Sequence, residues 1–454
     1  MAANLCFRKN TEKSSFIQKY LIVFAQEHLK FRYGELDSIC SLLNISIDKK
    51  FLKLEAESPF LIIDLPSDSE ALKISSRSIL IKCILKLYGY ADSWEDLVAI
   101  LGHYNSDDLL QHTPSSIQTY KITVESFNKK LDHAKKLAYI DCLSFLPLNG
   151  VVNLKNPVTT FMLFLDHSLI PTRFFFGRLI SYGQRHLIKY YSIKTRHFIG
   201  NTTMDVQLAL IMANMGQCHD GMLVYDPFVG SGSILVACSH FGSYSCGSDI
   251  DRTLLLGRGH PSRADKGKWR GIKGESIKSN FEMYKLENHY VDVWMGDQMN
   301  TPLRKSFMFD AIVTDPPYGI REGSRKLAKA LIQNAGTSQS ILGVKLPSTE
   351  CCLLSDAIYN LLQFAAAHLV LNGRLVYWLP SHRGTFKMEH IPTHPCLKLL
   401  FVSEQILSGN VSRHLITMEK IKEPKKSDNL NIDKNLREIH NRFRNHYFKV
   451  AKNG

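Results

Sequence analysis

The sequence predicts an α/β fold in two parts, with a mainly parallel, doubly wound sheet in the second half and a smaller α+β region before it. From Met222 onward, short apolar runs alternate with helix-length segments, as in a parallel sheet with crossover helices. The first of these runs meets a glycine-rich turn, DPFVGSGS (226–233). A later run, Phe309–Val313, ends abruptly at DPPYG (315–319).

Composition bounds the class of protein. A chain of 454 residues with 44% hydrophobic content can form two or three globular domains. The formal net charge of +14 favours a polyanionic partner, nucleic acid before membrane. The most apolar helical run, Cys352–Leu371, is interrupted by polar residues and suits a buried helix better than a membrane span.

Ten cysteines are scattered without a CxxC pair, which argues against a disulfide framework or a zinc site in this chain. The start, MAANLCFRKNTEK, lacks the apolar core of a signal peptide. We therefore expect a reducing compartment, a cytoplasmic location and no metal.

The first half reads as a small α+β region. Residues 1–15 are polar, and we expect them to be disordered. The expected strands are Tyr20–Ala25, Phe60–Leu65 and Ser78–Leu87, and the expected helices are Glu35–Asn44 and Ser67–Leu72. This β-α-β-β rhythm suits a ferredoxin-like arrangement.

A second group of elements follows. Thr119–Phe127 alternates as a strand does, Lys130–Ser144 is helical, and Val151–His167 reads as strand, Asn-Pro turn and strand. Phe174-Phe175-Phe176 is interpreted as a core strand rather than a platform for stacked bases. Residues 190–205, with Lys194, Arg196 and His197, are expected to form a charged, solvated linker before a helix at Met204–Asn214.

The glycine-rich turn is a candidate nucleotide site. It lies between a strand at Met222–Tyr225 and a helix at Ile234–His240, where doubly wound folds bind nucleotides. Gly230 and Gly232 allow the backbone to approach a ligand, and the helix N-terminus favours a carboxylate. The next strand, Tyr244–Ser248, ends at an acid suited to ribose hydroxyls; Asp249 is preferred over Asp251.

Further strands complete the predicted sheet. They are Val291–Met295, which ends at Gly296-Asp297, then Phe309–Val313, Gly373–Leu379, Leu397–Leu407 and Arg413–Met418.

The DPPYG corner is the candidate catalytic centre. Two consecutive prolines fix φ twice and hold a rigid turn that presents the Asp315 carboxylate, the Pro316 carbonyl and the Tyr318 ring together. Two fixed acceptors could turn the lone pair of a base's amino group toward an electrophile. The alternative is a structural Pro-Pro turn with a surface tyrosine.

The DPPY motif resembles that of S-adenosylmethionine-dependent methyltransferases that act on exocyclic amino groups of bases. The resemblance implies that Asp315 and Pro316 accept the amino hydrogens, that Pro317 shapes the corner and that Tyr318 stacks on the base. It also implies donor binding by Asp226, Phe228, Gly230, Gly232 and Asp249, adenine contact by Asp297, and a segment around Thr202 lining the methionine end of the donor.

The chain as a whole resembles one family. The first half is similar to a THUMP domain, which binds tRNA, and RHFIGNTTMD, DPFVGSG, SDID, TDPPYGIRE and GRLVYWLP resemble eukaryotic tRNA methyltransferases that modify the amino group of guanine 10. Ser231 stands where threonine is commoner. The resemblance implies tRNA as substrate, S-adenosylmethionine as cofactor, and a small zinc-binding activator subunit as partner.

The expected organisation is therefore a tRNA-binding region at 16–189, the linker at 190–205, a class I Rossmann-like methyltransferase domain at 206–422 and a basic tail at 423–454. Within the basic stretch Arg252–Lys273, we expect phosphate contacts from Arg263, Lys266, Lys268 and Arg270, with a solvated loop as the alternative.

Two other functions stay open. An adenine- or cytosine-amino methyltransferase would share the DPPY motif but would not need the THUMP-like half. A non-catalytic RNA-binding module could retain the fold, although Asp226, Asp249, Asp297 and Asp315 together argue against it.

Overall fold

The structure, a computed structural model, describes residues 18–48, 58–103, 118–148, 150–200, 202–257, 274–318, 325–327, 340–341, 344–345, 349–407, 410–425, 428 and 436–441. The chain divides into two compact units. The first comprises Met1–Gln26, Leu43–Arg77 and Ile81–Gly183. The second comprises Glu27–Leu42, Ser78–Leu80 and Gln184–Gly454.

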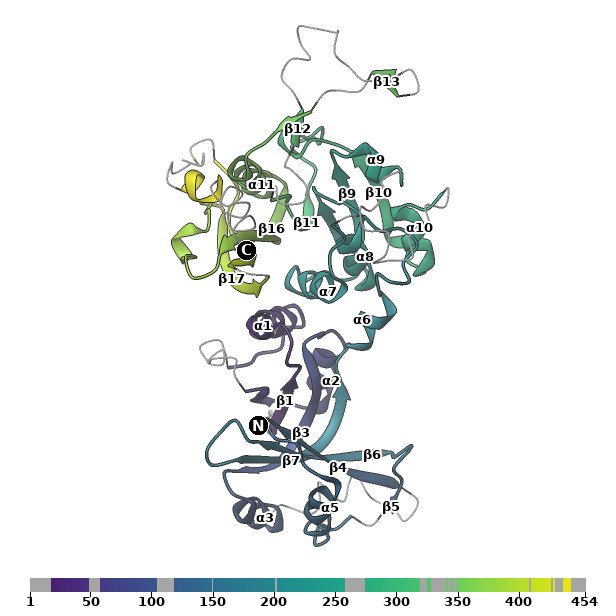
Figure 1. Cartoon of the computed structure of the whole chain (residues 1–454), viewed down its shortest axis with the longest axis vertical. Coiled ribbons are helices and arrows are strands. Elements are labelled where there is room, and N and C mark those ends of the chain that lie inside the picture. The colour runs from purple at the N-terminus through teal and green to yellow at the C-terminus, as the bar shows by residue number, and fades with distance from the viewer. Residues whose placement is uncertain are drawn as a thin grey trace, which may run out of the picture. The chain divides into compact units, whose positions relative to one another are not determined.

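The first unit is built on one mixed sheet with strand order β2-β1-β3-β7-β6-β4-β5 (Figure 1). Its strands are β1 (Gln18–Phe24), β2 (Phe60–Leu65), β3 (Ile81–Ala91), β4 (Thr119–Phe127), β5 (Val151–Val152), β6 (Thr159–Asp166) and β7 (Arg173–Tyr182). Its helices are α2 (Asp68–Ser75), α3 (Trp94–Gly102) and α5 (His133–Asp141). Strand β3 pairs with β7, so the ferredoxin-like and THUMP-like strands form one sheet.

The phenylalanine run at 174–176 is buried in β7, which confirms the core-strand interpretation. Helix α3 was not expected, although its start carries a recognisable signal. Ser93 caps the helix by accepting the Asp96 backbone N–H at 3.1 Å, and Leu97 and Leu101 point into the core.

The second unit carries a seven-stranded sheet with order β10-β9-β8-β11-β16-β18-β17, which confirms the expected fold class. Its strands are β8 (Leu223–Asp226), β9 (Tyr244–Asp249), β10 (Tyr290–Met295), β11 (Phe309–Thr314), β16 (Leu369–His382), β17 (Leu397–Ile406) and β18 (Val411–Lys420). The first five in this order are parallel, and β18 runs antiparallel to both β16 and β17. The strand order reverses direction between β8 and β11, which is where doubly wound sheets bind ligands.

Helices pack on both faces of this sheet. The helices of this unit are α1 (Arg32–Leu42), α6 (His186–Tyr190), α7 (Val206–Met215), α8 (Ser233–His240), α9 (Arg252–Leu255), α10 (Ile277–Met283) and α11 (Leu354–His368). Ile312 and Tyr377 pack with Leu362 of α11 on one face. On the other face, Trp378 meets Met212 of α7.

Short elements complete the unit. The 3-10 helices are η1 (Leu29–Phe31), η4 (Glu287–His289), η5 (Gln298–Asn300) and η7 (Met388–His390). Two-stranded sheets join β12 (Arg325–Leu327) to β15 (Thr349–Cys351) and β13 (Ser340–Ile341) to β14 (Val344–Lys345).

Helix α1 lies near the chain's beginning but belongs to the second unit, where Figure 1 shows it beside α7. Its fully buried Glu35 accepts hydrogen bonds from Ser78 Oγ at 2.7 Å, the Ile79 and Leu80 backbone N–H groups at 2.9 and 3.0 Å, and Asn214 Nδ2 at 2.9 Å. Burial raises the pKa of Glu35, which these donors oppose. The unit boundary therefore differs from the expected division at 189–190, because one carboxyl group ties two early segments to α7.

The segment expected to be a solvated linker is packed into the second unit. Arg196 is buried, donates to Ser233 Oγ and to the Tyr191 carbonyl at 3.0 Å, and lies over the Tyr284 ring. Phe198 is fully buried and exchanges two hydrogen bonds with the Asn280 side chain. This segment is thus a fixed part of the unit that holds the glycine-rich turn.

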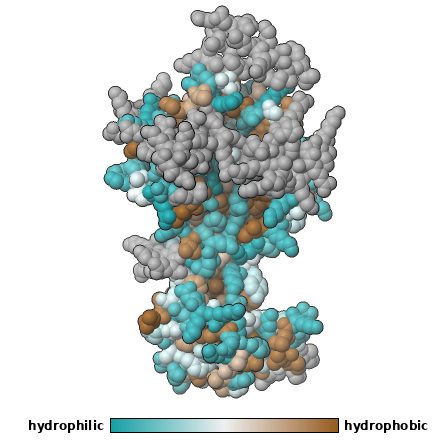
Figure 2. Space-filling model, viewed as in Figure 1, coloured by the Kyte–Doolittle hydropathy of each residue, from teal (hydrophilic) through white to brown (hydrophobic). Residues whose placement is uncertain are grey.

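In the part of the chain that the structure describes, no helix is long and apolar enough to span a membrane. The face shown in Figure 2 is largely hydrophilic, with hydrophobic residues in small separate groups. The described cysteines are free thiols.

We predict that Glu35→Ala lowers the free energy of unfolding by about 3 kcal/mol, because several buried donors lose one acceptor together. Urea unfolding followed by circular dichroism measures the change. The matched control is Glu389→Ala, whose side chain is 70% exposed and should change stability by less than about 0.5 kcal/mol. Equal effects of the two substitutions would contradict the structural role of Glu35.

Candidate active site

The candidate site lies where β8 and β11 end side by side at the switch point of the sheet. Asp226 is the last residue of β8, and Thr314 is the last residue of β11. The Thr314 hydroxyl donates to Asp226 Oδ1 at 2.5 Å. The glycine-rich turn and the DPPYG corner, 88 residues apart in sequence at this bond, are therefore joined directly.

The glycine-rich turn has the backbone that its sequence predicts. Gly230 and Gly232 have φ of 52° and 76°, the left-handed region that glycine enters without strain. A Cβ on Gly232 would lie 2.6 Å from Ile277 Cγ2, so a side chain is excluded there. The Phe228 backbone N–H donates to Asp226 Oδ1 at 3.0 Å, which closes the turn on the carboxylate.

Asp226 is fully buried, and its Oδ2 has no hydrogen-bond partner among the described residues. Burial raises its pKa to about 7, with the charges of Asp249 and Asp315 adding to the effect. A buried, unpartnered carboxylate oxygen beside a glycine turn suits a cationic group of a ligand. The residues present therefore fit a cofactor that carries an ammonium group.

The two acids after β9 have different surroundings. Asp249 accepts the Gly230 backbone N–H at 2.9 Å, so its carboxylate lies against the glycine turn. Asp251 caps α9 by accepting the Thr253 and Leu254 backbone N–H groups at 2.9 and 3.2 Å. This arrangement favours Asp249 as the ribose ligand.

Asp297 is buried after β10 and already accepts several hydrogen bonds from the protein. Its Oδ1 accepts from the Met299 backbone N–H, and its Oδ2 accepts from Asn300 Nδ2 and the Leu327 backbone N–H. The neighbouring Gln298 is buried, and neither polar atom of its amide has a partner in the described part of the chain. Gln298 is thus a polar group at this edge that the sequence did not single out.

The NTTMD segment has two adjacent threonines, and Thr203, not the predicted Thr202, contacts the glycine-rich turn. Thr202 is exposed, whereas the Thr203 hydroxyl lies 3.0 Å from Ser231 Oγ and accepts the Gly200 backbone N–H at 2.8 Å. Sequence alone could not separate adjacent threonines in an irregular segment.

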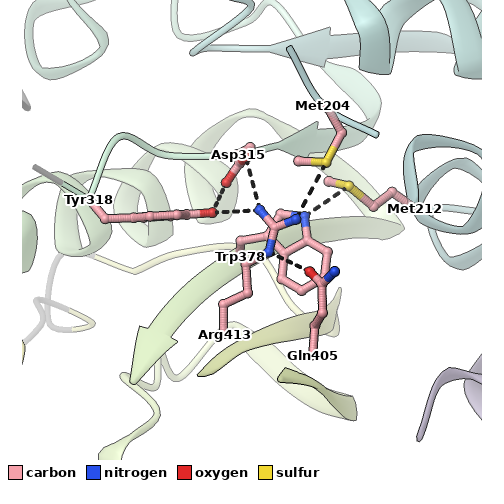
Figure 3. Close-up of polar contacts among 7 residues, drawn as sticks. All are labelled: Met204, Met212, Asp315, Tyr318, Trp378, Gln405 and Arg413. Carbon is pink, nitrogen blue, oxygen red and sulfur yellow. Dashed lines mark hydrogen bonds and ion pairs between the residues drawn. The ribbon is translucent and has the colours of Figure 1, made fainter. Parts of the chain in front are cut away.

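The DPPYG corner, described as far as Tyr318, holds its carboxylate between two donors (Figure 3). The Tyr318 hydroxyl donates to Asp315 Oδ1, and Arg413 Nη1 lies 3.3 Å from Asp315 Oδ2. Burial, with the charge of Asp315, raises the pKa of Tyr318 well above its usual value, so the phenol is neutral and can donate. Arg413 is 98 residues from Asp315 in sequence, and no local motif marks it.

Four expected RNA-binding residues, Arg263, Lys266, Lys268 and Arg270, lie outside the described residues. Among the described residues, no group of three or more histidine, cysteine, aspartate or glutamate side chains could hold a metal ion.

The sheet order, the switch-point turn and the DPPY corner together place the second unit in the class I methyltransferases that use S-adenosylmethionine. Family models agree with the two-part organisation. A model described as Tmrp11 THUMP N-terminal domain matches residues 18–185, and one described as N-6 DNA Methylase matches residues 186–342.

Several curated relatives are similar over nearly the whole chain. The tRNA (guanine(10)-N(2))-methyltransferase TRMT11 of Gallus gallus is 43% identical over 444 residues, covering 95% of each chain. The Homo sapiens protein of that name is 41% identical, covering 96% of each chain. The tRNA (guanine(10)-N(2))-methyltransferase of Schizosaccharomyces pombe is 35% identical, covering 87% of this chain and 81% of its own. The chain belongs to the tRNA (guanine(10)-N(2))-methyltransferase family.

Proposed function

We propose that this chain is the catalytic subunit that transfers a methyl group from S-adenosylmethionine to the exocyclic amino group of guanine 10 in tRNA. Family membership supports the substrate. The observation that supports the mechanism is the Thr314–Asp226 hydrogen bond, which joins the DPPYG corner, the proposed amine site, to the glycine-rich turn, the proposed cofactor site.

On the cofactor side, Asp226 Oδ2 would accept the cofactor's ammonium group, and Asp249 would accept its ribose hydroxyls. Phe228, Gly230 and Gly232 form the turn around it, and Asp297 lies on the adenine side. When bound, S-adenosylmethionine would supply an electrophilic methyl group on a positively charged sulfur, and the S–CH3 bond that breaks would leave neutral S-adenosylhomocysteine.

On the substrate side, the Asp315 carboxylate and the Pro316 carbonyl accept the two amino hydrogens of the flipped guanine, and Tyr318 stacks on its ring. Pro317 keeps the corner rigid. Because the Tyr318 hydroxyl donates to Asp315 Oδ1 in this structure, the incoming amino group must replace that phenol as donor. Tyr318 thus exchanges a hydrogen bond for a stacking contact when the base enters.

Asp315 acts by orientation first and by proton acceptance second. The lone pair of an aromatic amine is delocalised into the ring, and two fixed acceptors hold it toward the methyl group. A carboxylate, whose usual pKa is about 3.9, is too weak a base to deprotonate the neutral amine. The proton therefore leaves after attack, when the methylated nitrogen has become strongly acidic.

The first unit, which holds most of the expected tRNA-binding region at 16–189, is proposed to bind the tRNA. Arg263, Lys266, Lys268 and Arg270 of the second unit remain predicted phosphate contacts. The net charge of +14 supports both assignments.

The match to the N-6 DNA Methylase model favours one competing reaction, in which the methyl group is transferred to an adenine or cytosine amino group. One experiment separates the reactions. Labelled S-adenosylmethionine is incubated with the protein and unmodified tRNA, and the labelled nucleoside is then mapped. The proposal expects N2-methylguanosine at position 10; a labelled adenosine or cytidine supports the competing reaction.

We further propose a small zinc-binding activator as the partner subunit, docked on the open edge of the second sheet. Strand β10 pairs only with β9 in the described part of the chain. Val291 and Met295 on β10 and Tyr244 on β9 are exposed there. An unpaired strand edge with apolar side chains can pair with a strand of another protein.

Asp226→Asn should remove a pH dependence of S-adenosylmethionine affinity. Because the pKa of Asp226 is raised to about 7, its carboxyl is neutral at lower pH, so affinity should fall as pH decreases through 7, by at most about tenfold per pH unit. Calorimetric titration between about pH 5.5 and 7.5 measures this slope. The control Asp251→Asn should keep it, and a flat profile for the parent protein would contradict the assignment.

Asp315→Ala should lower the single-turnover methylation rate by about 100-fold or more and change tRNA affinity by less than about threefold, because the carboxylate acts on the amine during transfer. Tyr318→Ala should reduce both rate and affinity, because stacking is worth about 1–3 kcal/mol. The control is Asp220→Ala, at an exposed position. A parent-like rate for Asp315→Ala with both substrates bound normally would make the corner purely structural.

Val291→Lys should weaken the complex with a coexpressed activator subunit, since it places a charge in the apolar edge. Co-purification yield and size-exclusion chromatography report the complex. Val152→Lys, at a similarly exposed valine of the first unit, is the matched control and should leave the complex intact. Equal complex yields for the two variants would place the activator elsewhere.

A further inference from the structure

Arg413 of β18 joins the DPPYG corner to three other segments of the second unit (Figure 3). Its Nη1 lies 3.3 Å from Asp315 Oδ2 and 3.3 Å from the Tyr318 hydroxyl. Its Nε donates to Gln405 Oε1 on β17 at 2.7 Å, and its Nη2 lies 3.8 Å from Met204 Sδ. With the side chain 12% exposed, the guanidinium is held from several directions.

The guanidinium of Arg413 also lies over an aromatic ring. Its central carbon lies 3.9 Å from the centroid of Trp378, which is fully buried on β16. Trp378 is itself anchored through Nε1, 3.1 Å from Met212 Sδ on α7. The cation–π contact and the hydrogen bonds together restrict how the guanidinium can turn.

The negative charge of Asp315 in the DPPYG corner is balanced by a nearby cation. Asp315 lies near Asp226, whose pKa its charge helps to raise, and Asp205 acts electrostatically on Arg413 from the start of α7. The pKa of Arg413 is raised, because Tyr318 and Asp315 outweigh the opposing effect of burial. His28, also near Arg413, has its pKa lowered by burial and is neutral near pH 7. Arg413 is therefore the cation that balances Asp315 among these described groups.

We propose that Arg413 is a positioning residue for methyl transfer: its Nη1 holds Oδ2 of Asp315, so that Oδ1 faces the amino group of the base. The proposal rests on the role of Asp315 proposed above. The acceptor geometry required for transfer tolerates little movement. The prolines fix the backbone of the corner, and Arg413 fixes the carboxylate.

Direct contact between Arg413 and a tRNA phosphate is the competing role. The two roles differ in how the residue depends on Asp315. A phosphate ligand would contribute to tRNA affinity whether or not Asp315 is present, whereas a positioning residue has little left to do once the carboxylate is gone.

A double-mutant cycle with Arg413→Met, Asp315→Asn and the double variant separates these roles. We expect Arg413→Met to lower the single-turnover rate at saturating tRNA and S-adenosylmethionine by about tenfold or more in the parent protein, but by less than about twofold when Asp315 is already Asn. Affinities for both substrates should change by less than about threefold. Arg413→Lys, which keeps the charge without the fork, should recover part of the rate.

The control Arg383→Met, at an exposed arginine just after β16, should leave the rate unchanged. Equal fold-losses for Arg413→Met in both backgrounds, or a loss confined to tRNA affinity, would overturn the proposal. A parent-like rate for Asp315→Asn would instead overturn the proposed role of Asp315 itself.

Gln405→Leu gives a second route if Arg413→Met does not fold. It removes the 2.7 Å anchor of Arg413 and leaves the charge in place. We expect a loss of about threefold in the single-turnover rate that disappears in the Asp315→Asn background. An unchanged rate for Gln405→Leu would then overturn the proposal.

Discussion

The ion pair between Asp315 and Arg413 is the interaction on which the candidate active site depends. A carboxylate in this half-buried corner is costly to desolvate without a charged partner, and Arg413 supplies one beside the Tyr318 hydroxyl. The pair also connects the segment after parallel strand β11 to antiparallel strand β18. The antiparallel end of the sheet therefore reaches the candidate site at its centre.

The second constraint is the switch point of the sheet. Strands β8 and β11 are neighbours although the β9 and β10 segments separate them in sequence, so the glycine-rich turn after one and the DPPYG corner after the other must lie together. The Thr314–Asp226 hydrogen bond makes that adjacency rigid. It also places carboxylates close together, and the raised pKa of Asp226 follows from its burial and from these neighbours.

Motifs whose conformation is set by neighbouring residues were predictable from the sequence. The glycine turn, the DPPYG corner and strands such as β2 and β4 follow from residue patterns within a few positions. Arg413 and Gln298 were not, since their environments arise from segments far apart in the chain. Helix α1 was predicted as a helix, but its place beside α7 depends on Glu35, a residue that local pattern would put on the surface.

The prediction that residues 190–205 form a solvated linker was wrong at Arg196 for a related reason. Arg196 looks like a solvated charge in sequence, yet Ser233, Tyr191 and Tyr284 enclose it. Long polar side chains can be buried when the fold supplies partners, and those partners lie up to 88 residues away in sequence.

If the Asp315 corner acts on the exocyclic amino group of guanine 10, methylation must depend on that group. Labelled methyl transfer to tRNA carrying guanine at position 10 is therefore compared with transfer to tRNA carrying inosine, because inosine lacks only that amino group. We expect both tRNAs to bind with similar affinity and only the guanine tRNA to be methylated. Equal labelling of the two tRNAs would contradict it.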